Sequence, residues 1–254
     1  IQEANLEGEI MRKKRLMEYV MLPTTYRLRI IFILTMGLLF AFPVYAQEAL
    51  WKELNSKVIK FYQKDQYRNA ISAANEALKV AEKTFGPDHP KTATSLNNLA
   101  LIYKAMGKQA AAEDFYKRAL TILEKSFGSD NPRVATALYN LARLYHEQEK
   151  YAEAEHMYKR ALEIDEKILS PEHPDVALSL NNLALLYIDQ GRYDEAESLF
   201  ERVLTILEKS LGPDHQNIAY VLEEQASLYL KTGRKDEAEK SSKRAELIRS
   251  KGIK

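Results

Sequence analysis

A short turn-like segment recurs in this chain at a constant spacing of 42 residues. Its four copies begin at Gly86, Gly128, Ser170 and Gly212, and they read Gly-Pro-Asp-His-Pro, Gly-Ser-Asp-Asn-Pro, Ser-Pro-Glu-His-Pro and Gly-Pro-Asp-His-Gln. The blocks between these copies are also related to one another. A fixed period of this size is typical of a stacked array, because one such unit cannot bury its own apolar face without a neighbour. We therefore expect function to lie on a repeated surface rather than in a single catalytic pocket.

The N-terminal region differs from the repeats in composition. Arg27 and Arg29 precede an apolar run over residues 30–42, and Pro-Val-Tyr-Ala follows and ends at Ala46. This order of charged, apolar and small residues predicts a secretory signal peptide that is cleaved after Ala46. Residues 1–46 are then translated flank plus signal peptide, and residues 47–254 form the repeat array.

The alternative for this region is an uncleaved membrane anchor. Thirteen helical residues rise only about 20 Å, whereas the hydrocarbon core of a bilayer is roughly 30 Å thick. The length therefore favours cleavage and an exported protein, in the periplasm or secreted. The chain begins with Ile1, so the true start codon is open, and Met21 would leave a compact signal.

The composition excludes several classes of function. The chain has no cysteine, so disulfides, thiolate metal ligands and a cysteine nucleophile are excluded. Without residues 1–46 it retains 31 basic and 32 acidic residues, which gives no reason to expect nucleic acid or an anionic membrane as a ligand. The sequence contains neither a phosphate-binding glycine loop nor a nucleophile elbow. We therefore expect no enzyme activity, no cofactor and no metal.

Apolar and small residues within each period recur at steps of three and four. Leu180, Leu183, Ala184 and Tyr187 form one such stripe, and a second stripe follows before the next turn segment. This spacing predicts two amphipathic helices in each period and an all-α fold. The expected units are residues 48–85, 86–127, 128–169, 170–211 and 212–250.

The turns within and between the units carry helix-ending and helix-starting residues. Glycine stands at the break between the paired helices in three of the four clear units, as at Gly191, where a helix often ends in a left-handed residue. Pro90, Pro132 and Pro174 suit the first turn of the following helix. The histidines of these turns, His89 among them, are expected to form capping or turn hydrogen bonds.

The recurring small and aromatic residues resemble a known repeat signature. Ala100, Tyr103, Gly107, Ala112 and Tyr116, with their counterparts 84 residues later, are similar to the tetratricopeptide repeat (TPR). The 42-residue spacing and the Asn-Asn-Leu-Ala block are most similar to the kinesin-light-chain type. The resemblance covers residues 48–250 and implies a right-handed α-solenoid of about five helix pairs, in which the two terminal pairs act as caps.

The resemblance also implies where a ligand would lie. In this family the first helix of each pair lines the concave side of the superhelix, which is called the groove wall below. Carried over by position, the candidate binding residues on the groove wall are Asn97, Asn98, Leu101, Lys104, Tyr139, Asn140, Arg143, His146, Asn181, Asn182, Leu185, Ile188 and Tyr220.

Asparagines form one column along the groove wall, with Asn98, Asn140 and Asn182 at equivalent places. An amide side chain offers two donors and an acceptor, so such a column can pair with the backbone of an extended peptide. The alternative is that the amides only link one repeat to the next. Leu185 and Ile188 are equally open to two interpretations, as apolar subsites or as packing between helices.

These patterns predict a non-catalytic, exported scaffold for protein–protein interaction that binds an extended peptide or a partner helix in its concave groove. We expect a monomer with a protein or peptide partner, no nucleic acid, and no membrane after cleavage of the signal. The alternative is a structural or assembly component of an envelope complex that acts through its outer or terminal surfaces.

Overall fold

The computed structural model describes residue 11 and residues 44–251. The chain divides into two units, residues 1–53 and residues 54–254, which are described separately. Within the first unit, residues 44–53 are helical. The predicted signal peptide falls, except for residues 44–46, outside the described residues and stays a prediction. Among the described helices, none combines the length and the apolar character that crossing a bilayer requires.

The second unit is built from helices joined by short turns, and its described part contains no strand. Residues 54–62 are helical and precede the first labelled helix. The helices that follow are α3 (Tyr67–Thr84), α4 (Pro90–Ala105), α5 (Gln109–Phe127), α6 (Pro132–Glu147), α7 (Tyr151–Leu169), α8 (Pro174–Asp189), α9 (Tyr193–Leu211), α10 (Gln216–Lys231) and α11 (Lys235–Lys251).

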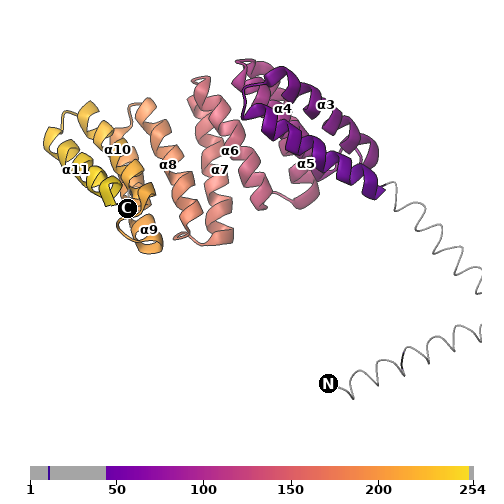
Figure 1. Cartoon of the computed structure of the whole chain (residues 1–254). Helices are drawn as coiled ribbons and strands as arrows, with labels where there is room; N and C mark the ends of the chain where they lie inside the picture. Colours follow the sequence, from indigo (N-terminus) through magenta and orange to yellow (C-terminus); the bar gives the residue numbers. More distant parts are fainter. Residues whose placement is uncertain (1–10, 12–43, 252–254) are drawn as a thin grey trace, which may run out of the picture. The chain divides into compact units, whose positions relative to one another are not determined.

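Helices consecutive in sequence pack as antiparallel pairs, and the pairs stack side by side (Figure 1). The most extensive contacts lie within the pairs α4–α5, α6–α7, α8–α9 and α10–α11, and smaller contacts join each pair to the next. The helix over residues 54–62 packs on α3 through Val58, which lies in one cluster with Ala70 and Ala73. The predicted all-α solenoid of five helix pairs is therefore confirmed.

The signature alanines lie where helices approach most closely. Ala100, Ala142 and Ala184 are fully buried, and Ala226 is 4% exposed. A side chain larger than a methyl group would overpack these contacts, which explains why the position stays small in these four units. The aromatic residues of the second helices, such as Phe200, are buried beside them. One core cluster thus runs from α4 to α11, and a second, smaller cluster packs the first pair against α4.

The turn histidines cap the helices that follow them. The Nδ1 atoms of His89, His173 and His215 each accept a hydrogen bond from the backbone N–H two residues later, at 3.1–3.2 Å. Asn131 does the same in the third unit through its side-chain oxygen. These bonds satisfy one of the backbone N–H groups that a helix start leaves unpaired. The predicted capping role is confirmed.

A residue with a left-handed backbone conformation follows the first helix of each clear pair, as predicted from the positions of the glycines. Gly107, Gly191 and Gly233 have φ values of 72°, 74° and 78°, and in the unit that lacks this glycine Glu149 takes the conformation with φ 59°. A non-glycine residue adopts this conformation at some cost in free energy. The tertiary packing of the repeat therefore fixes the turn even where the residue does not favour it.

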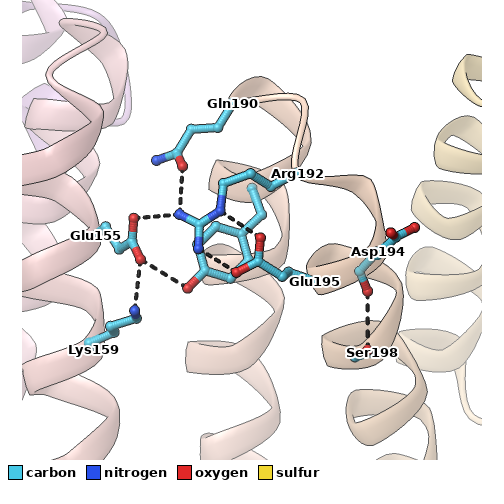
Figure 2. A network of polar contacts seen from close by, with 8 residues as sticks. Glu155, Lys159, Gln190, Arg192, Asp194, Glu195 and Ser198 are labelled. Carbon is cyan, nitrogen blue, oxygen red and sulfur yellow. Dashed lines mark hydrogen bonds and ion pairs between the residues drawn. The ribbon is translucent and has the colours of Figure 1, made fainter.

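Successive pairs are also joined by charged contacts at equivalent places. Glu155 of α7 accepts a hydrogen bond from the Tyr187 hydroxyl of α8 at 3.1 Å and one from Arg192 at 2.6 Å, and it pairs with Lys159 of its own helix (Figure 2). The Arg192 guanidinium lies 3.9 Å from the centre of the Tyr187 ring. The tyrosine and cation contacts recur one unit earlier around Glu113, where Lys150 replaces the arginine, and one unit later around Glu197.

The carboxylate of Glu155 has a strongly lowered pKa. Burial alone would raise the pKa of Glu155, but the hydrogen bonds from Lys159, Arg192 and Tyr187 outweigh it and lower the pKa to about 2. The carboxylate side chain is only 19% exposed, so these contacts are weakly screened by water. The signature residue Tyr187 therefore has a second role besides packing, because its hydroxyl donates a hydrogen bond to Glu155 of the preceding unit.

We predict that the stabilisation due to Glu155 depends on pH. Its folded-state pKa lies below the ordinary value of 4.5, so its contribution is complete above about pH 4.5 and is lost as the pH falls toward 2. Urea unfolding should show Glu155→Gln to be less stable than the parent by roughly 2 kcal/mol at pH 7 and nearly equal to it near pH 2. The exposed Glu163→Gln serves as the control and should differ little at either pH. A Glu155 difference that stays constant with pH would contradict this assignment.

Candidate functional site

The first helices of the pairs supply the candidate site. Helices α4, α6, α8 and α10 carry every predicted groove-wall residue, at intervals set by the 42-residue repeat. Because equivalent residues occupy equivalent places on neighbouring helices, each column of the sequence becomes a row of side chains along the stack. The chemistry of this wall therefore depends on which residues remain available after contacts between the units have formed.

Two polar residues of the groove wall already contact the next unit. Lys104 of α4 forms an ion pair with Glu147 of α6 at 2.6 Å, and its side chain is only 9% exposed. His146 of α6 contacts Asp189 of α8 at 2.8 Å. Both contacts join residues 43 positions apart. These two side chains therefore link units, and Lys104 in particular is not an open cation for a ligand.

The asparagines of the column differ in their hydrogen-bond partners. Asn98 donates to the side chain of Asn55 at 2.6 Å, which joins the first two pairs. Asn182 donates to the backbone carbonyl of Leu178 in its own helix at 2.6 Å. Asn140 is half-buried between them. Linkage between repeats thus describes Asn98, and the side chain of Asn182 also contacts Tyr139 of the preceding unit. The role of this column in binding a ligand stays a prediction.

The remaining predicted residues differ in exposure. Ile188 is 7% exposed and lies in the main core, so it belongs to helix packing rather than to an open subsite. Leu185 is half-buried and packs against the same core, and Leu101 is also half-buried. Arg143 is exposed. Tyr220 is 47% exposed and is one of the large apolar side chains at the surface of the second unit.

A pocket of about 210 Å³ lies between α8, α9 and α10 and is called the aliphatic pocket below. Its lining consists of Pro174, Ala177, Leu178, Asn181, Val203, Leu207, Asn217, Tyr220 and Val221. Leu178 is 60% exposed, although it is a large apolar side chain. Asn181 is 6% exposed, and its Oδ1 atom has no hydrogen-bond partner. The pocket thus combines apolar walls with one buried, unpaired acceptor.

A second pocket of about 350 Å³ lies one unit earlier, between α6, α7 and α8, and is called the acidic pocket below. Its lining consists of Pro132, Ala135, Thr136, Tyr139, Asp165, Leu169, Asp175, Leu178 and Ser179. Nearly all of these positions are the 42-residue counterparts of the aliphatic pocket. Leu178 lines both pockets and therefore separates them.

Asp165 distinguishes the acidic pocket chemically. Its carboxylate accepts a hydrogen bond from the Ser179 hydroxyl at 2.8 Å. Burial raises the pKa of this carboxyl above its ordinary value, the Ser179 bond lowers it in part, and the nearby Asp175 charge raises it again. The units on either side carry Leu123 and Leu207 at the equivalent place. An acid replaces a buried leucine here, and within residues 44–251 no cation pairs with it.

Sequence reasoning missed Asp165 and gave no special weight to Leu178. Asp165 lies on a second helix, outside the wall that the family resemblance implies, and it lines the acidic pocket because α7 packs against both α6 and α8. The signal that could have found it is its departure from the leucine column at that position. Among the described residues, no group of three or more histidine, aspartate or glutamate side chains is arranged to hold a metal ion.

We predict that Asn181→Leu raises the free energy of unfolding by about 1 kcal/mol. A buried acceptor without a donor costs about 1–3 kcal/mol, and leucine has a similar shape. Urea unfolding at pH 7 measures the change. Asn182→Leu is the matched control and should bring no gain, because the Asn182 amide is bonded to Leu178. A loss of stability in Asn181→Leu would mean that the acceptor is satisfied, for example by an ordered water.

Comparison with known structures supports the helix-pair assignment. The chain is similar to BtubC (BKLC) from P. vanneervenii, with 26% identity, 86% of each chain covered and a TM-score of 0.75. It is also similar to the TPR-like repeats of a putative kinesin light chain from Podosopora anserina, with 26% identity, 79% of this chain and 95% of that chain covered, and a TM-score of 0.70.

A Rap protein complexed with competence and sporulation factor shares the fold, with 17% identity, 79% of this chain and 54% of that chain covered, and a TM-score of 0.63. No curated protein sequence matches the chain significantly. The family model named Tetratricopeptide repeat matches residues 54–125, 114–167 and 175–250. These matches cover most of the chain, which therefore belongs to the tetratricopeptide repeat family, with repeats of the kinesin-light-chain type.

Proposed function

We propose that this TPR protein is a non-catalytic scaffold that is exported and binds an extended segment of a partner protein along its groove wall. The observation that carries the proposal is the presence of two neighbouring pockets on that wall, with an exposed leucine between them and polar atoms inside them. Exposed apolar side chains that gather at one place mark interaction sites, and exposed Leu178 and Tyr220 both line the aliphatic pocket. The TPR family itself supports protein–protein interaction rather than catalysis.

The groove wall is suited to backbone recognition as well as to side-chain recognition. The amides of Asn140 and Asn182 lie on neighbouring first helices at equivalent places. An extended peptide presents alternating backbone donors and acceptors that such amides can pair with. Backbone contacts of this kind provide affinity, while the pockets discriminate between side chains.

The alternative is an assembly role through outer or terminal surfaces. One observation favours it: Leu230 and Leu247 of the last unit are 63% and 55% exposed. The rest of α11 is rich in charged residues, however, and Ala238, Ala245 and Ile248 turn inward. We therefore favour the groove wall over end-to-end stacking.

The groove proposal is tested with a triple variant. Asn98→Ala, Asn140→Ala and Asn182→Ala together should abolish capture of partner proteins from an envelope extract, because the backbone contacts are lost. Helicity should be retained, since alanine favours helices more than asparagine does. The control carries Asp114→Ala, Glu163→Ala and Thr205→Ala on exposed faces of the second helices. Unchanged capture by the asparagine variant would refute the groove proposal.

Export is tested separately. Expression of the full chain with its N-terminal region in a bacterial host should yield a protein outside the cytoplasm whose N-terminal sequence begins at Gln47. This result is expected because a signal peptidase cleaves after small residues such as Ala46. A membrane-bound product that retains residues 21–46 would instead support the anchor, and an intact cytoplasmic product would refute export.

A further inference from the structure

The two pockets differ in chemistry at equivalent places. Where the aliphatic pocket has Leu207 and Val221, the acidic pocket has Asp165 and Ser179. Asn217 at the edge of the first pocket is matched by Asp175 in the second. The same backbone framework therefore presents an apolar subsite and an acidic subsite next to each other. One ligand that fills both pockets needs a different kind of side chain in each.

The acidic pocket is incomplete without a cation. One glutamate column on the second helices is paired with an arginine of the following second helix in each unit, as in Glu124 with Arg160 and Glu166 with Arg202. Asp165 lies on α7 one position before Glu166, yet its contact is the neutral hydroxyl of Ser179. A partly buried carboxylate that lacks an opposite charge is costly, and a cation placed beside it removes much of that cost.

The aliphatic pocket adds an independent observation. Asn181 is more than nine-tenths buried, lines this pocket, and has an Oδ1 atom without a donor. Such an acceptor can be satisfied by the backbone N–H of a peptide whose side chain enters the pocket. The surrounding walls of Val203, Leu207 and Val221 favour an aliphatic side chain over a polar one.

The spacing of the pockets limits the distance between the two ligand side chains. The two pockets share Leu178 in their linings, and packed helices lie about 8–10 Å apart, which sets the scale of the separation between the pockets. In a polyproline II segment each residue rises about 3.1 Å, so side chains three residues apart lie on the same face at about 9 Å. An extended ligand can therefore fill both pockets with residues i and i+3.

We propose that the groove wall over α6, α8 and α10 selects an extended partner segment with a lysine or arginine in the acidic pocket and an aliphatic side chain three residues away in the aliphatic pocket. The proposal rests on the proposed function and specifies its partner class. Asp165 and Asp175 attract the cation, Asn181 accepts a backbone hydrogen bond, and Leu178 packs against the segment between the two anchors.

The first test is selection from a phage library of random twelve-residue peptides on the immobilised full chain. Enrichment of peptides with a basic and an aliphatic residue three positions apart, in either order, is expected. Enrichment of acidic peptides, or of peptides without this spacing, would overturn the inference while leaving groove binding intact. Failure to enrich any peptide over the asparagine triple variant would overturn both.

The second test assigns the charge preference to Asp165. The most enriched peptide and its analogue with the basic residue changed to methionine are titrated by fluorescence anisotropy against the parent and Asp165→Asn. The variant should bind the basic peptide at least tenfold more weakly and the analogue about equally, which is the signature of direct coupling. An equal loss for both peptides would refute the assignment.

Two further variants complete the design. Asp165→Leu restores the residue found in the neighbouring units, so it is expected to fold at least as stably as the parent and to lose the basic preference. Glu163→Gln removes an exposed charge from the same helix and should leave both affinities unchanged. If Glu163→Gln weakened the basic peptide as much as Asp165→Asn does, general attraction between charges would explain the preference and the pocket would not.

Discussion

The contact between successive helix pairs is the interaction on which the whole structure depends. No pair can bury its own apolar face, so each unit is stable only against its neighbours. Fully buried alanines such as Ala142 and Ala184 set the close approach of the helices. Glutamates on the second helices also orient one pair on the next. Glu155, for example, accepts hydrogen bonds from both Tyr187 and Arg192 of the following unit. A nonspecific apolar contact could slide, whereas these bonds fix the register of one pair on the next.

This regularity gives meaning to the residues that depart from it. An array can carry an unfavourable residue in one unit because the contacts in the other units hold the framework. Asp165 in a leucine column is such a departure, and Asn181 is a repeated residue whose buried oxygen is unpaired. They lie in adjacent pockets on one surface, with exposed Leu178 between them. Each is costly to the folded protein by itself, and together they define a surface that a complementary segment would complete.

The fold could be predicted almost entirely from the sequence, and the candidate site only in part. The positions of the asparagine column followed from the period, but the bond from Asn98 to Asn55 did not. Lys104 was expected to bind a ligand on the groove wall, yet it pairs with Glu147 of the next unit. Such contacts join residues 43 positions apart and depend on how one helix is rotated against another. A repeat length cannot specify this rotation.

The sequence by itself determined the helix pairs, their boundaries, the capping residues and the small positions, because these depend on local propensity and on a regular 42-residue period. The tertiary structure alone decided which polar residues remain available and which lie in pockets. Asp165 belongs to a second helix, and only the packing of α7 against both α6 and α8 brings it to the acidic pocket. Local rules act along the chain, whereas a binding surface is made where three helices from two units meet.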